Sequence, residues 1–378
     1  MFYEYVKGNQ QMNLQMNRQL SAFKDDLRVK EDLSGIIPSL TDLNSWFETW
    51  YRFGEKRELN GDYDLACVYF SLAQFYLKKN DENKKDTVHR YLNNFYLSYK
   101  GLEYESYEVP YDNSFLPAIK IEMNPNATKT LLVISGFDSF MEEILAVIGL
   151  FKGTDYNIIL FDGPGQGRAL IDNDLKFTPY FENPVSALLD YFGLDEVDAM
   201  GVSWGGYFVV RAAAYEKRIK RVVCFDFFYD GLNVFLNGIE KNLKERIIQL
   251  LHQGNSEEVN KLVNDVIGDN LDAQFKFNKG YENTGENIPY DLLKNVANHN
   301  IRGLGELVTQ DVLLLAGKED QYVPFEDLIL EQNELINTRS LVTKIFTKET
   351  GGEQHCQAGR YDLAINEIRL FLGEPGLL

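Results

Sequence analysis

The chain has 378 residues, of which 44% are hydrophobic and 25% charged, enough for one large α/β domain and a smaller one. Its formal net charge is −19, which argues against nucleic-acid binding because that function needs a basic surface to meet phosphates. Three scattered cysteines do not make a disulfide framework. No apolar run approaches the roughly 20 residues that span a bilayer, and polar residues 1–19 lack the apolar core of a signal peptide. We therefore expect a cytoplasmic protein without a membrane segment.

The first hundred residues contain at least three amphipathic helices, in which apolar residues recur at intervals of three and four. The three stripes are Leu43, Trp46, Phe47, Trp50 and Tyr51; Leu65, Val68, Tyr69, Leu72 and Tyr76; and Val88, Tyr91, Leu92, Phe95, Tyr96 and Tyr99. We interpret them as packing faces of an all-helical N-terminal domain, residues 1–102, and not as a cofactor site. The same aromatic residues could also form the face of a homodimer.

Strands and helices alternate along most of the remaining chain, residues 103–378. Short strands follow Tyr104, and from Leu131 onwards each strand is followed by a helix. This alternation predicts an α/β fold with a mainly parallel sheet.

A glycine-rich run, residues 163–167, follows the strand 157–161 and could in principle open a dinucleotide site. Its spacing is G-x-G-x-G, so its third glycine comes one position earlier than in the dinucleotide-binding pattern G-x-G-x-x-G. Pro164 also removes an N–H that a pyrophosphate would use. The chain also lacks the P-loop pattern, H-E-x-x-H and paired C-x-x-C motifs. We therefore expect neither a cofactor nor a metal.

The sequence Gly-Val-Ser-Trp-Gly, residues 201–205, lies where the apolar run 197–200 meets a predicted helix. In a G-x-S-x-G nucleophile elbow the strand turns so sharply into the helix that only glycine fits on either side of the serine. Such a turn exposes the Ser203 hydroxyl at the end of a sheet. It also leaves the N–H of Trp204 able to donate to an oxyanion.

Helical patterns interrupt the strand alternation between about residues 231 and 302. An insertion at this point would overhang the carboxyl ends of the strands, where ligands bind in open α/β sheets, so we interpret it as a lid. The alternative is a structural elaboration that does not touch substrate.

The acid of a catalytic triad is expected on a loop after a later strand. The apolar run 311–316 breaks at Gly317, and Asp320 in the following loop is the candidate. Its neighbour Glu319 could also serve, and Asp226 and Asp230, which follow the strand 221–225, are remoter alternatives.

The base is sought among only four histidines. His89 points off the apolar face of its helix, His252 lies near the end of a helix, and His299 lies between two asparagines in a polar stretch. His355 differs because it lies in a flexible loop, residues 349–355, that follows the β-branched strand 341–347. A base could reach Ser203 from this loop. Cys356 beside it lacks an elbow, so we interpret that cysteine as incidental.

The serine elbow 201–205, the acid loop 317–324 and the histidine segment 353–357 follow one another in this order. With these three segments the chain resembles the α/β-hydrolase superfamily. The segments 135–139 and 161–167 make it similar to a branch with an N-terminal helical domain, which includes acylaminoacyl-peptidase-like and dienelactone-hydrolase-like proteins, dihydroxypseudooxynicotine hydrolase and the fermentation-respiration switch protein group. The resemblance implies Ser203 as nucleophile, Asp320 as acid and His355 as base, with the N–H groups of Phe137 and Trp204 as oxyanion donors. In one departure, Ser135-Gly136 stands where many hydrolases have His-Gly.

The sequence thus predicts a serine hydrolase acting on a small acyl substrate, without a cofactor. An ester, an acylated amino acid or peptide, and an activated C–C bond all pass through a tetrahedral carbonyl adduct, so the triad alone does not choose among them. A different class of function, a regulatory binding protein on the same fold, is the alternative.

Overall fold

A computed structural model of the chain describes residues 2–78, 80–101, 103–123, 125–268 and 270–377. The chain divides into two compact units, Met1–Gly101 and Leu102–Leu378, one residue before the predicted boundary. Each unit is described by itself below.

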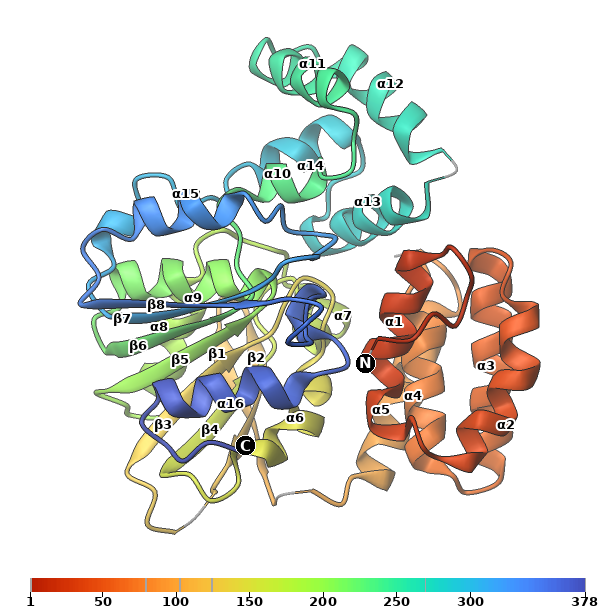
Figure 1. Cartoon of the computed structure of the whole chain (residues 1–378), viewed down its shortest axis with the longest axis horizontal. Helices are drawn as coiled ribbons and strands as arrows, with labels where there is room; N and C mark the ends of the chain where they lie inside the picture. Colours follow the sequence, from red (N-terminus) through yellow and green to blue (C-terminus); the bar gives the residue numbers. More distant parts are fainter. Residues whose placement is uncertain (1, 79, 102, 124, 269, 378) are drawn as a thin grey trace. The chain divides into compact units, whose positions relative to one another are not determined.

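The first unit consists of helices packed side by side (Figure 1). Its α-helices are α1 (Gln10–Leu20), α2 (Leu27–Ile36), α3 (Leu43–Leu59), α4 (Tyr63–Gln74) and α5 (Lys84–Ser98). The aromatic stripes are packing faces, as predicted: Trp46 and Trp50 are fully buried, and the indole N–H of Trp46 donates to the carbonyl of Leu72 at 2.6 Å.

Helix α1 was not among the predicted helices, because its buried residues mix amides with apolar side chains and so break the apolar spacing. Asn13 and Asn17 are buried, and each exchanges hydrogen bonds of 2.8 Å with the backbone of a residue in the preceding segment, Val6 and Tyr3 respectively. A buried amide whose hydrogen bonds are made can replace an apolar contact. Hydrophobic periodicity does not detect such a face.

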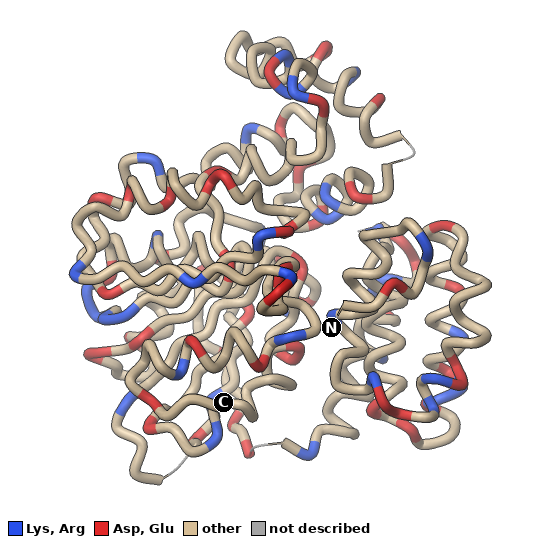
Figure 2. Tube along the Cα trace, in the orientation of Figure 1, with Lys and Arg blue, Asp and Glu red and all other residues tan. Residues whose placement is uncertain are grey.

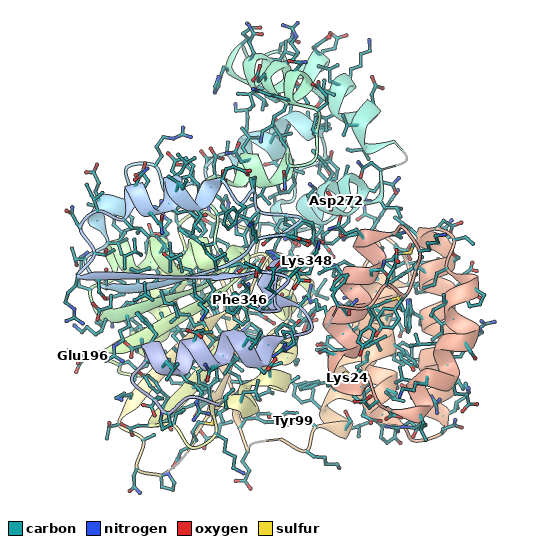
Figure 3. The ribbon with its side chains drawn as sticks, viewed as in Figure 1. Lys24, Tyr99, Glu196, Asp272, Phe346 and Lys348 are labelled. Carbon is teal, nitrogen blue, oxygen red and sulfur yellow. The ribbon has the colours of Figure 1, made fainter. Side chains whose placement is uncertain are left out.

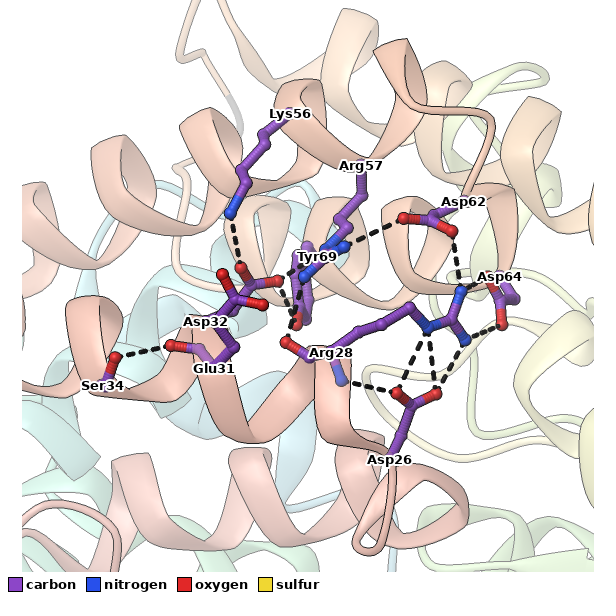
Figure 4. A network of polar contacts seen from close by, with 10 residues as sticks. All are labelled: Asp26, Arg28, Glu31, Asp32, Ser34, Lys56, Arg57, Asp62, Asp64 and Tyr69. Carbon is purple, nitrogen blue, oxygen red and sulfur yellow. Dashed lines mark hydrogen bonds and ion pairs between the residues drawn. The ribbon is translucent and has the colours of Figure 1, made fainter.

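A polar network joins α2, α3 and α4 (Figure 4). The buried carboxylate of Asp32 accepts from Arg57 at 2.6 Å, from the hydroxyl of Tyr69 at 3.1 Å and from Lys56 at 2.9 Å. Arg57 also pairs with Asp62 at 2.9 Å, and Asp62 pairs with Arg28 at 2.8 Å. Each of the two arginines therefore meets carboxylates that neutralise its charge.

The second unit is built on an eight-stranded sheet with the order β1-β2-β4-β3-β5-β6-β7-β8. The strands are β1 (Glu105–Tyr111), β2 (Ser114–Ile121), β3 (Lys129–Ile134), β4 (Tyr156–Phe161), β5 (Val197–Val202), β6 (Ile219–Phe225), β7 (Asp311–Gly317) and β8 (Ser340–Phe346). β2 pairs antiparallel with β1 and with β4, and the other pairings are parallel, as the strand-helix alternation predicts. The central strands are almost fully buried, which is typical of a parallel sheet covered on both faces.

Helices connect the parallel strands, and a group of five helices is inserted between β6 and β7. The connecting and C-terminal helices are α6 (Met141–Ile148), α7 (Gly167–Ile171), α8 (Glu182–Tyr191), α9 (Trp204–Tyr215), α15 (Asp327–Glu334) and α16 (Tyr361–Phe371). The inserted helices are α10 (Gly231–Phe235), α11 (Lys241–His252), α12 (Ser256–Ile267), α13 (Leu271–Thr284) and α14 (Pro289–Val296). They occupy the predicted insertion, and α11 and α12 project furthest from the sheet (Figure 1).

Acidic and basic residues are interspersed along the helices and loops (Figure 2). Some ion pairs among them are local, such as Asp272 with Lys276 at 2.8 Å on one turn of α13, where Figure 3 labels Asp272, and others join distant segments, such as Lys129 with Glu374 at 3.1 Å. Within the described residues, no helix combines the length and the apolarity needed to cross a bilayer.

Candidate active site

Ser203 lies at the sharp turn between β5 and α9. Its backbone has φ 58° and ψ −121°, which is a strained conformation for a residue with a side chain. A Cβ on Gly201 would lie 1.8 Å from the carbonyl oxygen of Gly205, and one on Gly205 would lie 2.5 Å from that of Ile134. Only glycine fits at these two positions, and the turn holds the serine side chain out of the strand and the helix.

His355 and Asp320 complete a line of hydrogen bonds that begins at Ser203. The Ser203 Oγ lies 2.8 Å from His355 Nε2, and His355 Nδ1 lies 2.6 Å from Asp320 Oδ2. The other oxygen of Asp320 accepts from the N–H groups of Tyr322 and Val323 at 2.7 and 3.0 Å. With the Nδ1 proton on the Asp320 side, Nε2 is free to accept the proton of the serine hydroxyl.

Backbone hydrogen bonds join the loop that carries Asp320 to the loop that carries His355. The N–H of Glu319 donates to the carbonyl of Glu353 at 2.9 Å, and the N–H of Lys318 donates to that of Phe346 at 2.9 Å. A Cβ on Gly317 would lie 2.6 Å from the Glu353 carbonyl oxygen, so glycine permits this close approach. The loops after β7 and β8 therefore hold Asp320 and His355 in a fixed relation to each other.

The three alternative acids lie in different places, and only one of them is near His355. The carboxylate of Glu319 turns outward to Lys348 at 2.8 Å, beyond the end of β8, where Figure 3 labels Lys348. Asp230 caps α10 by accepting from the N–H of Leu232 at 2.8 Å. Asp226 does reach the site, since its Oδ2 lies 3.4 Å from His355 Nδ1.

The charges of this cluster shift its pKa values. Burial opposes a charge on His355, but the charge of Asp320 and its hydrogen bond outweigh that effect and raise the pKa of His355 well above its ordinary value. Burial also opposes a charge on Asp320, yet the nearby His355 and the backbone donors lower the pKa of that carboxyl. Burial and the charge of Asp320 together raise the pKa of Asp226 to about 7.

The backbone N–H groups of Phe137 and Trp204 have no acceptor among the described residues. Trp204 is the first residue of α9, where a helix leaves its N–H groups unpaired. Phe137 follows Gly136, whose Cβ, if present, would lie 3.0 Å from the Cβ of Ser203. The serine thus has an unpaired N–H at its own turn and lies against the loop that carries a second one.

Gln166 fixes the loop after β3 and joins it to the glycine-rich run. Its side-chain amide donates to the carbonyls of Ser135 and Gly136, the latter at 3.0 Å, and its oxygen accepts from the N–H of Gly163 at 2.9 Å. The carbonyl of Gly136 and the N–H of Phe137 belong to one planar peptide and point in opposite directions. Holding that carbonyl therefore aims the Phe137 N–H away from Gln166.

Asn283, at the end of α13 in the insertion, holds the next peptide of the same loop. Its side-chain amide donates to the carbonyl of Phe137 at 2.6 Å, and its own carbonyl accepts from the N–H of Phe177 at 2.8 Å. Asn237 of the insertion similarly donates to the carbonyls of Gln321 and Tyr322, beside Asp320. The insertion thus contacts two of the loops around Ser203, which favours the lid interpretation.

His299 is fully buried, contrary to the expectation of an unremarkable polar stretch. Its Nδ1 accepts from the indole N–H of Trp204 at 3.0 Å, and its ring stacks on Phe177 with centroids 5.0 Å apart. Burial, followed by the charge of Arg211, lowers the pKa of His299 to about 3, so the ring is neutral. Its flanking asparagines gave no sign that the folded chain would place it among aromatic rings.

Buried aromatic rings from several segments gather around Trp204. Phe137 and Phe228 lie with ring centroids 5.1 and 4.5 Å from that of Trp204, and Phe235 of α10 contacts both Phe137 and Trp204. All four side chains are buried. The surroundings of the serine turn are therefore largely apolar and aromatic.

Among the described residues, Asp226, His355 and Cys356 offer ligand atoms close enough to share one metal ion. Their other interactions compete with a metal. His355 Nδ1 already has a carboxylate partner, and burial raises the pKa of the Cys356 thiol to about 11, whereas a metal needs the thiolate. The thiol donates instead to the carbonyl of Phe225 at 3.5 Å. We assign no metal to these residues.

The chain belongs to the α/β hydrolase fold family, which matches residues 135–343, more than half of the sequence. Among curated proteins it is 31% identical over 241 residues to the alpha/beta hydrolase psoB of Aspergillus fumigatus, a match covering 52% of this chain and 53% of psoB. It is 24% identical over 327 residues to the hydrolase acrC of Aspergillus aculeatus, covering 71% and 73% of the two chains. It is also 29% identical over 223 residues to the 20-hydroxy-prefusarin hydrolase FUS2 of Gibberella moniliformis, covering 49% and 52%. The match with psoB and FUS2 thus spans about half the length of each.

Two solved structures share the fold over nearly the whole chain. Wild-type AbyA5 has a TM-score of 0.65 at 18% identity, with 92% of this chain and 91% of that chain covered. The 2,6-dihydroxy-pseudo-oxynicotine hydrolase has a TM-score of 0.64 at 17% identity, with 96% of both chains covered. At these identities the likeness concerns the fold alone.

Proposed function

We propose that this α/β hydrolase is a serine hydrolase that cleaves a carboxylic ester or amide of a small acyl substrate through an acyl-enzyme on Ser203. One observation carries the proposal, the continuous pair of hydrogen bonds from Ser203 through His355 to Asp320. These residues follow β5, β8 and β7, whose carboxyl ends lie at one edge of the sheet. A serine, a base and an acid in this relation are the groups that nucleophilic acyl transfer requires.

The reaction proceeds in two halves. His355 Nε2 takes the proton of the Ser203 hydroxyl as Oγ attacks the substrate carbonyl carbon, and it then gives that proton to the leaving alcohol or amine. Water attacks the acyl-enzyme in the same way, with His355 as base, and releases the carboxylic acid and the free serine. Asp320 keeps its charge throughout and stabilises the imidazolium that forms in each half.

The two unpaired N–H groups, of Phe137 and Trp204, are the donors we propose for the oxyanion of each tetrahedral intermediate. Fixed backbone donors stabilise this charge without reorganising during the reaction. Gln166 and the start of α9 hold the two donors in place from outside the site. Neither donor depends on a side chain at Ser135, so the replacement of His-Gly by Ser-Gly leaves this arrangement intact.

The aromatic surroundings of Trp204 support a small, partly apolar substrate. An ester or amide is the proposed substrate, and hydrolysis of the C–C bond of an activated ketone is the alternative on the same triad. Two similar proteins are named for small-molecule substrates, FUS2 for 20-hydroxy-prefusarin and one structural neighbour for 2,6-dihydroxy-pseudo-oxynicotine. We propose a small-molecule substrate for this chain also, bound without a cofactor.

The direct test is the intact mass of the protein after treatment with a fluorophosphonate probe. The wild-type chain should gain one adduct, Ser203→Ala should gain none, and Ser340→Ala, which removes a hydroxyl bonded to Asp311 at the start of β8, should label like wild type. A folded wild-type chain that takes no adduct would contradict the proposal and favour a binding role on this fold.

Steady-state turnover is a second test of the Ser203→Ala variant. With short-chain p-nitrophenyl esters and acyl-amino-acid p-nitroanilides, Ser203→Ala should lower kcat by about four to six orders of magnitude, because the covalent route is lost. Retained turnover in that variant would remove Ser203 from the mechanism. Comparing the esters with the anilides then separates an esterase from an amidase.

A further inference from the structure

Asp226 is a second buried carboxylate at the histidine of the site. It follows β6, and β6 pairs with β7, which precedes Asp320. Because the two strands are parallel neighbours, their carboxyl ends bring both aspartates to the same edge of the sheet. The sequence distance of 94 residues between them is irrelevant to this placement.

Three contacts of the Asp226 carboxylate lead to the turn that carries His355. Its Oδ2 lies 3.4 Å from His355 Nδ1 and accepts from the N–H of Cys356 at 2.5 Å, while its Oδ1 accepts from the side chain of Gln357 at 3.0 Å. Its backbone has φ 50°, outside the ordinary range for a residue with a side chain. The contacts hold this carboxylate against the imidazole in spite of the backbone strain, and its side chain is only 2% exposed.

We infer that Asp226 is a second positioning acid, which shares the Nδ1–H of His355 with Asp320 and takes over that bond when Asp320 is lost. This inference rests on the proposed function of the triad. At 2.6 Å Asp320 makes the shorter bond, and at 3.4 Å Asp226 is within reach after a small rotation of either side chain. The third residue of a triad acts by holding the tautomer and orientation of the imidazole, and either carboxylate can do so.

The surrounding charges explain why one aspartate dominates. The titratable groups facing Asp226 are Asp320 from the β7 loop, His355 and Cys356 from the turn η5 (His355–Gln357), and Glu331 from α15. Two full negative charges beside one buried imidazole repel each other. Removing Asp320 ends this repulsion, so the charge of Asp226 is then favoured where the imidazolium needs it.

There is also room for the exchange. Asp226, Asp320 and Glu331 line one small cavity between the ends of β6 and β7 and the helix α15. A substitution that shortens the side chain at position 320 enlarges this space on the side of His355. The carboxylate of Asp226 can then close the remaining distance to Nδ1.

The test is a double-mutant cycle of Asp226→Asn, Asp320→Ala and the two together, measured as kcat and KM on p-nitrophenyl acetate and as the rate of fluorophosphonate labelling. Asparagine keeps the size of Asp226 and an oxygen for the Cys356 N–H, but it has no charge. We expect kcat to fall about three- to tenfold in Asp226→Asn, about 10- to 100-fold in Asp320→Ala, and about 10⁴-fold in the double variant, the last being the cost when a triad has no acid. KM should change little.

Two results would overturn the inference. One is a loss of about 10⁴-fold in Asp320→Ala alone, which would mean that no other carboxylate takes over. The other is an equal factor for Asp226→Asn in both backgrounds, which is what a merely structural residue gives. Should Asp226→Asn fail to fold by circular dichroism, the size of the loss in Asp320→Ala still decides between the outcomes. Asp230→Asn, in the same loop but bonded to Leu232 and Arg302, is the matched control and should behave identically in both backgrounds.

An NMR titration of the four histidines separates this inference from the proposed function. If Asp226 takes over, the pKa of His355 stays raised in Asp320→Ala and falls only in the double variant. A pKa that falls fully in Asp320→Ala contradicts the contact. The titration does not depend on turnover, whereas failure of the serine-hydrolase proposal would appear as a wild-type chain that fluorophosphonate does not label.

Discussion

The two units of the chain both bury carboxylates, but the carboxylates have cation partners in one unit and surround a histidine in the other. In the helical unit Asp32 is met by Arg57, Lys56 and the hydroxyl of Tyr69. In the hydrolase unit, among the described residues, Asp226 and Asp320 have no lysine or arginine partner, and both are turned towards His355. The first arrangement neutralises its charges within the network. The second leaves net negative charge around an imidazole.

This difference separates structural charge from functional charge. A buried pair that is fully matched joins helices and leaves no group that needs a further partner. Buried acids without a cation partner instead shift the pKa of whatever titratable group lies beside them, which is typical of active sites. The comparison predicts that substitutions in the first cluster affect stability, and that substitutions around the second affect rate.

The largest effect that separates the two regions is expected for Asp32→Asn. It leaves Arg57 buried without its closest carboxylate, which costs about 3–5 kcal/mol when one partner of a buried pair is removed. Urea unfolding followed by tryptophan fluorescence measures this loss, since two of the three tryptophans, Trp46 and Trp50, belong to the helical unit. Fluorophosphonate labelling of the folded variant should proceed at the wild-type rate.

The matched control is Asp25→Asn, which breaks an exposed pair with Lys30 at 3.8 Å. An exposed pair of this length contributes little, so the urea midpoint should stay at the wild-type value. Equal midpoints for Asp32→Asn and Asp25→Asn would show that the buried network does not stabilise the unit.

An intermediate effect, on rate, is expected for Gln166→Met. Methionine fills the space of Gln166 but cannot hold the carbonyls of Ser135 and Gly136, so the Phe137 N–H loses its fixed direction. We expect kcat to fall about 10- to 100-fold with little change in KM, somewhat less than removal of an oxyanion donor itself costs. Steady-state kinetics on p-nitrophenyl acetate measures both values.

Gln310→Met provides the comparison for this variant. Gln310 is also buried and also donates to a backbone carbonyl, that of Ala213 at 2.8 Å, but in α9 and away from the triad. Its loss should cost about 1–3 kcal/mol of stability and leave kcat unchanged. A similar fall in kcat in both variants would indicate a general loosening of the fold and not a specific role of Gln166.

The smallest expected effect is a shift in the pH dependence. His355 acts as a base only when neutral, and the charge and hydrogen bond of Asp320 raise its pKa, so kcat/KM should rise with pH through a midpoint above the ordinary histidine value of about 6.5. Removing the Asp226 charge reduces the stabilisation of the imidazolium and should move this midpoint to lower pH in Asp226→Asn. A pH–rate profile with an unmoved or raised midpoint would show that Asp226 does not act on His355 electrostatically.

Much of the fold was predictable because its signals are local. Strand-helix alternation indicated the parallel sheet, and regular apolar spacing indicated α3, α4 and α5. Helix α1 was missed because its buried residues mix apolar side chains with amides that bond the preceding backbone. Periodicity counts apolar side chains, and it does not register a polar side chain whose partners make burial favourable.

The sequence by itself determined the order and type of the chemical groups: an elbow serine, a later acid and a last histidine, each after a strand. Glycines at 201 and 205 carry this information because steric exclusion acts between near neighbours in the chain. Only the tertiary structure decided which acid reaches His355, that Asp226 stands beside Asp320, and that His299 lies against Trp204. These contacts join residues 35 to 95 positions apart, and they follow from the pairing of strands and the packing of rings, which no local pattern encodes.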